Sequence, residues 1–183
     1  MKVAISQIRK GGTSGIVPVV TENIVTGYEK MTCIVPAGVT SIGNYAFSFC
    51  SPLQSITLPE SLTSIGNSAF SYCSALQSIT LASATPRFDQ ELFGSMSDYT
   101  ELASVVVPQD WKPTYGDYGW NICLAFPALT IATLTDIVGN LGTWTDGDNT
   151  CTVYLNGART TDEGYADLVS AIEAKGYTVS TLS

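Results

Sequence analysis

The sequence predicts an α/β solenoid, in which short coils of the chain stack on one another and each coil contributes one strand. Two observations lead to this prediction. The segment TSIGNYAFSFC begins at Thr40, and the nearly identical TSIGNSAFSYC begins at Thr63, 23 positions later. When the chain is aligned on this doublet, its units open at Cys33, Ile56, Ile79 and Val105. The first two units therefore repeat the spacing of the doublet and the third is slightly longer, and a period in the twenties is typical of a solenoid.

The second observation is the alternation at the start of each unit. Two apolar residues separated by one position predict a short strand with both side chains facing inward. These pairs are Cys33/Val35, Ile56/Leu58, Ile79/Leu81 and Val105/Val107. Proline follows three of the four strands and ends them, because it has no N–H to donate to a ladder. We expect short parallel strands on the concave face and an irregular or short-helical return on the convex side, with Phe70 at the centre of the core.

The composition excludes several classes of function. Hydrophobic residues make up 45% of the 183 residues and charged residues 13%, which is typical of a folded domain. A net charge of −8 argues against nucleic-acid binding, which depends on basic patches. No apolar stretch approaches the length of about 18 residues that a membrane span needs, so no membrane insertion is expected. The stretch VAIS after Lys2 is also too short for the core of a signal peptide.

The sequence also argues against catalysis. It contains no histidine, which removes the commonest general base and most zinc sites. We find no nucleophile beside a base and no paired carboxylates in an identifiable cleft, so we expect neither an enzyme nor a cofactor. The five cysteines are interpreted mainly as small buried hydrophobic residues. Cys50 and Cys73 would lie one coil apart, and free thiols are favoured over a disulfide because both should point into the core.

The solenoid predicts three parts: an N-terminal cap over residues 1–31, repeats with a closing unit over residues 32–134, and a C-terminal capping segment over residues 135–183. In the first, KVAISQI and IVPVV flank the glycine-rich RKGGTSG, which predicts a hairpin or loose strand pair that covers the first coil. RKGGTSG lacks the Lys-Ser/Thr and the helix of a phosphate loop, so a plain turn is expected.

The C-terminal segment has a β–α–β pattern. TCTVYLNG and YTVSTL predict two strands, and Val153 and Val179 lie 26 positions apart, as in the longer units. Between them, Tyr165, Leu168, Val169 and Ile172 share one face of a predicted helix. Thr160 and Glu163 fit a capping box at its start, and Gly176 fits its end. We expect this segment to continue the solenoid with a helix on the convex side; a small separate α/β tail is the alternative. LTDIVGNLG could form a linking helix from Thr135.

Candidate binding residues lie beside the inward strand positions. Small hydroxylated side chains dominate this concave surface, which is nearly uncharged: Thr32, Ile34, Ser55, Thr57, Ser78, Thr80, Ser104 and Val106. Six or seven strands spaced about 4.8 Å apart would give a face roughly 30 Å long, along which an extended partner could lie. The alternative is a solvated sheet face with good strand propensity.

A second candidate is aromatic. Trp111, Tyr115, Tyr118 and Trp120 cluster near Asp110 and Asp117, and such side chains stack on sugars or anchor protein interfaces. The alternative is that Tyr115 and Trp120 lock the end of the array, which would leave Trp111 and Tyr118 as the exposed pair. Asp146 and Asp148 in TWTDGDNTC superficially suggest calcium, but an Asp-Gly turn explains them better, because the distal bidentate glutamate is missing.

LQSITLPESLTSIGNSAFSYCSAL resembles the repeats of the BspA-like (treponemal-type) leucine-rich-repeat family, with proline, SIG, AF and Cys in register over about residues 32–134. VVVPQDWKPTYGDYGWNICLAF resembles the closing unit of such arrays, with Tyr115 and Trp120 at the matching positions. The resemblance implies a leucine-rich-repeat solenoid that binds proteins or host surfaces, often at the bacterial cell surface.

We therefore expect a non-enzymatic module that binds a protein partner, on a host or bacterial surface, through the concave strand face. Two alternatives stay open. One is a glycan-binding module that uses Trp111 and Tyr118, and the other is a structural component of a larger assembly, such as a prophage tail.

Overall fold

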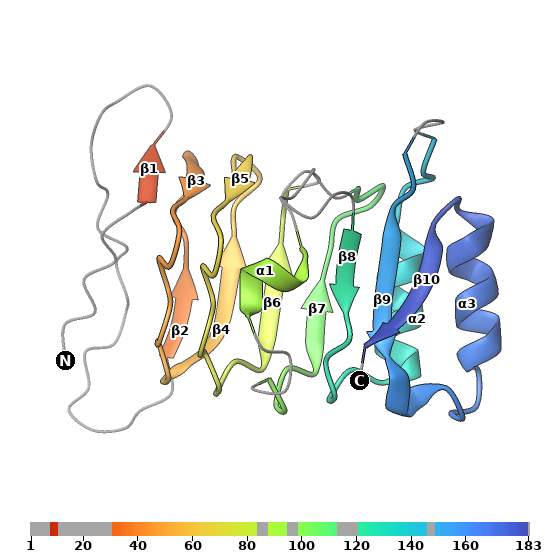
Figure 1. Cartoon of the computed structure of the whole chain (residues 1–183). Coiled ribbons are helices and arrows are strands. Elements are labelled where there is room, and N and C mark those ends of the chain that lie inside the picture. The colour runs from red at the N-terminus through yellow and green to blue at the C-terminus, as the bar shows by residue number, and fades with distance from the viewer. Residues whose placement is uncertain are drawn as a thin grey trace.

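The computed structural model describes residues 8–10, 31–83, 88–94, 99–112, 121–145 and 149–182 (Figure 1). One layer contains a parallel sheet whose strands follow each other in the chain: β2 (Met31–Ile34), β4 (Leu53–Leu58), β6 (Ser78–Leu81) and β7 (Ser104–Val106). Ser55 pairs with Ser78, and Ser78 pairs with Ser104. These partners lie one predicted unit apart, so the sequence period gives the register of this sheet, which we call the ladder sheet.

The return half of each coil forms a second layer. Here β1 (Ile8–Lys10) pairs antiparallel with β3 (Val39–Ile42), which pairs in parallel with β5 (Ser64–Ile65). The short helix α1 (Gln90–Phe93) follows in the third coil. A strand thus pairs with the first coil at residues 8–10, but Arg9 and Lys10 of this strand belong to the stretch RKGGTSG, for which a plain turn was expected. Apart from Ile8, the two predicted strands of the N-terminal cap lie outside the described residues.

A third sheet consists of β8 (Asn121–Leu124), β9 (Thr152–Asn156) and β10 (Thr178–Leu182), all parallel. Phe88 follows Ile65 of β5 at the spacing of the doublet, and it forms a parallel bridge with Ile122 of β8. This sheet therefore extends the return layer. The expected strands at TCTVYLNG and YTVSTL are confirmed, and Val179 pairs with Val153 as their separation in the sequence predicted.

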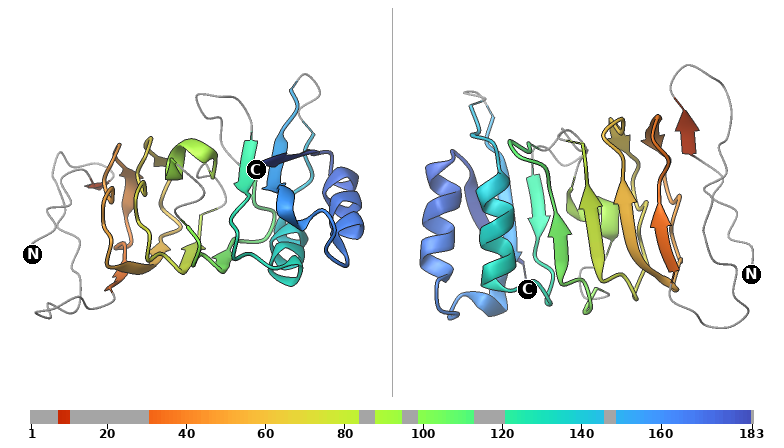
Figure 2. Two further views of the ribbon diagram at one scale, coloured as in Figure 1. Left: turned by 60° about the horizontal axis from the view of Figure 1, so that its bottom comes forward. Right: turned by 180° about the vertical axis from the view of Figure 1, so that it is seen from behind.

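Helices α2 (Ile131–Asn140) and α3 (Tyr165–Ala174) cover the face of the third sheet that points toward the ladder layer (Figure 2). They continue the layer of the ladder sheet, with α2 next to β7 and α3 beyond α2. Helix α2 contacts both β7 and α3. The prediction of a helix on the convex, return side is therefore wrong for α3. The reason is that β8 forms its bridge with Phe88, which lies in the return layer. Strands β9 and β10 pair on from β8 and therefore lie in the return layer too, so the helices between them lie in the layer of the ladder sheet.

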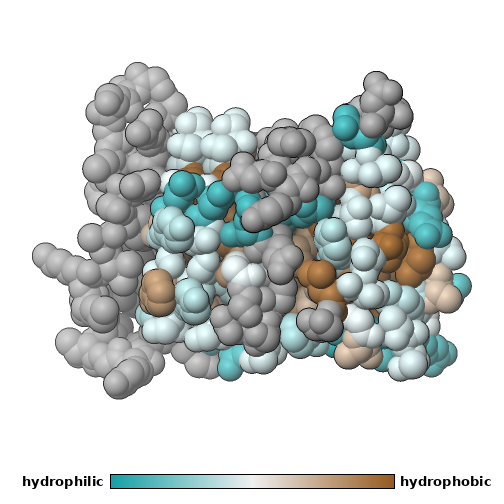
Figure 3. Space-filling model, viewed as in Figure 1, coloured by the Kyte–Doolittle hydropathy of each residue, from teal (hydrophilic) through white to brown (hydrophobic). Residues whose placement is uncertain are grey.

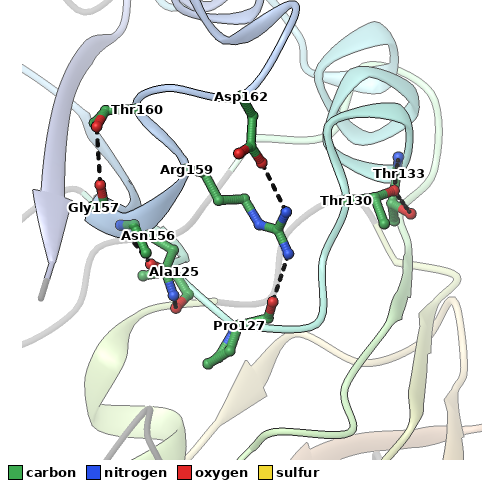
Figure 4. Close-up of polar contacts among 10 residues, drawn as sticks. Ala125, Pro127, Thr130, Thr133, Asn156, Gly157, Arg159, Thr160 and Asp162 are labelled. Carbon is green, nitrogen blue, oxygen red and sulfur yellow. Dashed lines mark hydrogen bonds and ion pairs between the residues drawn. The ribbon is translucent and has the colours of Figure 1, made fainter.

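The helix starts differ from those predicted. Helix α2 begins at Ile131 rather than Thr135, because the hydroxyl of Thr130 accepts the N–H of Thr133 and caps the helix (Figure 4). The capping box of Thr160 and Glu163 is wrong. Gly164, with φ +83°, is the N-cap of α3, and the Thr160 hydroxyl donates to Gly157 within the 3₁₀ helix η2 (Gly157–Arg159).

The end of α3 is confirmed at Gly176, which has φ +88°. A Cβ at this glycine would come within 2.6 Å of the Trp144 carbonyl oxygen, so the close approach also needs glycine. Arg159 fixes the loop before α3: its guanidinium forms an ion pair with Asp162 at 2.9 Å and donates to the Pro127 carbonyl at 2.6 Å (Figure 4). These contacts join the β9–α3 connection to the segment that follows β8.

The core lies between the two layers. Phe47, Phe70 and Phe93 come from successive coils, and their ring centroids lie 5.4 and 6.1 Å apart along a buried column. Phe70 is fully buried at its centre, as predicted. The Tyr99 hydroxyl contacts the Phe70 carbonyl and donates to the Phe93 carbonyl at 3.0 Å. On the return side, the described residues show apolar colour in separate patches (Figure 3).

Candidate functional site

The outward surface of the ladder sheet, which we call the ladder face, carries two rows of side chains in strand register. One row is Thr32, Ser55, Ser78 and Ser104, and the other is Ile34, Thr57, Thr80 and Val106. The inward neighbours in these strands are buried, so the alternation predicted from the sequence holds in each strand. All six strand residues predicted for binding, from Ser55 to Val106, therefore lie on one surface.

The ladder face is uncharged and accessible. Thr32 and Thr57 are exposed, and the two apolar side chains at the ends of the second row, Ile34 and Val106, are 65% and 49% exposed. The serines and Thr80 are partly exposed. The Ser55 hydroxyl donates to Thr32 Oγ1 at 3.0 Å, which fixes one hydroxyl pair across adjacent strands. The rows contain no charged side chain, so a partner would meet hydroxyl groups and two apolar corners.

The ladder face is shorter than predicted. It spans four strands, or about 14 Å at the usual strand spacing, because β8, β9 and β10 belong to the return layer. Helix α2 stands at its far end, where the Asn140 side chain donates to the Val107 carbonyl at 3.2 Å. At the start of the strands, Gln77 donates to Glu101 at 2.8 Å and adds a polar rim. The prediction of six or seven strands in one continuous face is thus wrong.

The predicted exposure of Trp111 is also wrong. Its side chain is 0% exposed and its ring meets that of Phe88 edge to face, with centroids 6.0 Å apart. The backbone of Trp111 accepts from Gly142 and donates to Asn140, which places it in a bridge with Leu141. A ring packed in this way anchors the helix-bearing end of the solenoid and cannot stack on a sugar. Tyr115, Tyr118 and Trp120 lie outside the described residues, as do Asp146 and Asp148.

The sequence reasoning missed an exposed aromatic pair. The rings of Phe49 and Tyr72 are stacked with centroids 4.5 Å apart, although the side chains are 71% and 55% exposed. Both residues have positive φ, 60° and 59°, which is rare for a bulky side chain. The signal was present in the doublet, since each copy places an aromatic residue directly before its cysteine.

The five cysteines are buried free thiols. Cys73 Sγ donates to the Phe47 carbonyl at 3.1 Å, one coil away. Burial is the main cause that raises the pKa of Cys33, Cys73, Cys123 and Cys151 to about 12, and it also raises that of Cys50. Such thiols remain protonated near neutral pH and are poor nucleophiles.

Among the described residues, no group of three or more cysteine, aspartate and glutamate side chains could hold a metal ion. In the same residues, no helix is long and apolar enough to cross a membrane.

Comparison with known proteins gives the family. A search of curated proteins found no match. A search of solved structures found the crystal structure of the T. pallidum leucine-rich repeat protein, with 19% identity and a TM-score of 0.39. That match covers 70% of this chain and 60% of the other, so this chain spans less than two thirds of its length. The family model described as the BspA type leucine rich repeat region matches residues 27–136, with six copies. The chain therefore belongs to the BspA-type leucine-rich repeat family.

Proposed function

We propose that this protein is a non-enzymatic module that binds a protein partner through the ladder face. The observation that carries the proposal is the uncharged surface formed by two registered rows of side chains. Its six central members are Ser55, Thr57, Ser78, Thr80, Ser104 and Val106. Family membership supports protein interaction in general terms, and the choice of surface rests on the geometry.

The chemistry of the ladder face favours an extended polypeptide. Hydroxyl groups can donate to or accept from a partner's backbone, and they cost less to desolvate than charged groups. Ile34 and Val106 supply exposed apolar corners that a partner could cover. The strands hold these side chains on a rigid, registered sheet, so little conformational entropy is lost when a partner binds.

Glycan binding through Trp111 is not proposed, because that ring is buried. A location at a bacterial surface remains part of the proposal, as does the division into a cap, a repeat array and a capping segment. Helix α2 (Ile131–Asn140) spans the proposed boundary between residues 134 and 135.

The experiment compares three proteins as bait in extracts of bacterial and host-cell surfaces. The first is the wild type and the second is Thr57→Arg/Thr80→Arg, which places two large cations on the ladder face. The third, Thr143→Arg/Thr161→Arg, adds the same charge at exposed loop threonines elsewhere. A partner captured by the wild type and the loop variant but lost by the ladder variant would support the proposal. No captured partner, or equal capture by all three, would refute it.

A further inference from the structure

We propose that β10 pairs with β10 of a second copy of this chain and joins two molecules through their return layers. Strand β10 is the last strand of its sheet, whose order is β10-β9-β8. It pairs with β9 along its full length, with five registered partners from Thr178 to Leu182. In the part of the chain that the structure describes, no strand occupies its other side. This inference concerns a different surface from the ladder face and does not depend on the proposed function.

The backbone groups available at this edge follow from one hydrogen bond. The Thr178 N–H donates to the Cys151 carbonyl, which precedes β9, at 3.0 Å. Thr178 therefore turns its backbone groups toward β9, and Ser180 and Leu182 do the same, because alternate residues of a strand point to the same side. Val179 and Thr181 turn their N–H and C=O groups away from β9. Each molecule thus offers two donors and two acceptors at this edge.

Strand β10 lacks the features that usually protect an exposed edge. Natural edge strands are shielded by lysine, proline, inward charges or a β-bulge. The sequence TVSTL contains no charge and no proline, and the pairing with β9 has no register shift. At the opposite end of the return layer, β1 contains Arg9 and Lys10 and has a register shift between them. The two ends of one layer therefore differ, and only β1 has the protected form.

The edge fits a second copy in one antiparallel register. A two-fold axis at Ser180 places Val179 opposite Thr181 of the other molecule, and Thr181 opposite its Val179. Each of these pairs exchanges two backbone hydrogen bonds, as the hydrogen-bonded pairs of an antiparallel ladder do. This arrangement is isologous and closes on itself, so it gives a dimer rather than a fibre. Within the paired strands no charged side chain meets its own copy, because TVSTL contains none, and this matters for a chain with a net charge of −8.

The surroundings permit this approach. Thr178, Ser180 and Thr181 are exposed, so the strand is not covered along its length. The neighbouring helix α3 exposes small side chains at Ala166, Ser170 and Ala174, and it also exposes the acidic side chains of Asp167 and Glu173. The interface is small, so the dimer is expected to be concentration-dependent. Since both molecules are acidic, added salt should strengthen the association by screening their repulsion.

The test combines sedimentation velocity with residue-resolved amide hydrogen exchange of the full chain at low and high concentration. A dimer should form at high concentration, and the amides of Val179 and Thr181 should then gain protection. The amides of Ser180 and Leu182, which face β9, should be protected at both concentrations. Thr181→Pro removes one outward donor from each molecule and leaves the inward donors intact, so it should weaken the dimer roughly tenfold or more.

The ladder variant Thr57→Arg/Thr80→Arg serves as the control and should dimerise like the wild type. A protein that stays monomeric at all concentrations would overturn the proposal. So would a dimer in which the amides of Val179 and Thr181 remain unprotected. Protection of these two amides in a monomer would mean that another segment covers the edge, and it would equally overturn the proposal. The exchange data need no variant, so they decide the matter even if Thr181→Pro fails to fold.

Discussion

The rings of Phe49 and Tyr72 stack at 4.5 Å with an angle of 12° between their planes, and this contact joins two successive coils outside the core. The Phe49 N–H donates to the Ser71 carbonyl at 2.8 Å, so the backbone of one coil holds the other in place. Positive φ costs a bulky residue about 1–2 kcal/mol, and an aromatic pair returns about 0.5–1.5 kcal/mol. The stack therefore offsets part of the strain at these two positions.

A double-mutant cycle tests this coupling. Phe49→Ala and Tyr72→Ala should each destabilise the fold modestly, and the double variant should cost less than the sum, with a coupling of about 0.5–1.5 kcal/mol. Urea unfolding of the four proteins measures it. Tyr45, which is 64% exposed and has positive φ, provides the control pair with Phe49, for which additive effects are expected. Additivity of Phe49→Ala and Tyr72→Ala would contradict the coupling.

The buried column makes a contrasting prediction. Phe70 is 0% exposed between Phe47 and Phe93, so Phe70→Ala should leave a cavity and cost about 3–5 kcal/mol. The free energy of unfolding in urea measures this loss. Phe49→Ala removes the same atoms from an exposed position and should cost much less. A Phe70→Ala midpoint equal to that of the wild type would show that Phe70 is misplaced.

A substitution at Trp111 distinguishes the buried ring of the structure from the exposed ring that the sequence suggested. An exposed ring could be removed without harm, whereas the buried ring predicts that Trp111→Ala costs about 3–5 kcal/mol. Near-UV circular dichroism should also change, because the ring packs in a fixed edge-to-face contact with Phe88. A variant with unchanged stability and an unchanged spectrum would argue against the buried position.

These differences show what a repeat period can and cannot predict. The period gave the register of the ladder sheet and of Val153 with Val179, because equivalent residues of stacked coils must pair. The period did not predict that β8, β9 and β10 lie in the return layer, because a period does not say which half of a coil a strand occupies. The position of Phe88, one doublet spacing after Ile65, indicates the layer, because Phe88 follows Ile65 in the return layer and pairs with Ile122 of β8.

The residues of the ladder face were predicted better than the number of strands that form it. The outward rows followed from alternation within each strand, which is local. The burial of Trp111 depends on Leu141, 30 positions later, and its neighbours Asp110 and Lys112 give a surface-like local pattern. Phe49 and Tyr72 have positive φ although no glycine marks these positions in the sequence. At Phe49 the N–H donates to the Ser71 carbonyl of the next coil, a contact that the local sequence does not reveal.

The buried thiols predict how stability depends on pH. Burial raises the pKa of Cys33, Cys73, Cys123 and Cys151 to about 12, while an unfolded thiol has a pKa of about 8.5. Between these values the unfolded chain loses protons that the folded chain keeps. The stability from these groups is therefore complete below about pH 8.5 and is lost progressively as the pH rises toward about 12. Burial also raises the pKa of Tyr177, which acts in the same direction.

Two measurements check this prediction. The midpoint of urea unfolding should fall between about pH 8.5 and 11, and Cys123→Ala should show a shallower fall because one buried thiol is absent. A thiol-specific disulfide reagent at pH 8 should react slowly with the folded protein and should titrate all five cysteines in denaturant. Rapid reaction of the folded protein would show that at least one thiol is accessible. A midpoint that stays constant to pH 11 would show that the folded and unfolded thiols titrate alike.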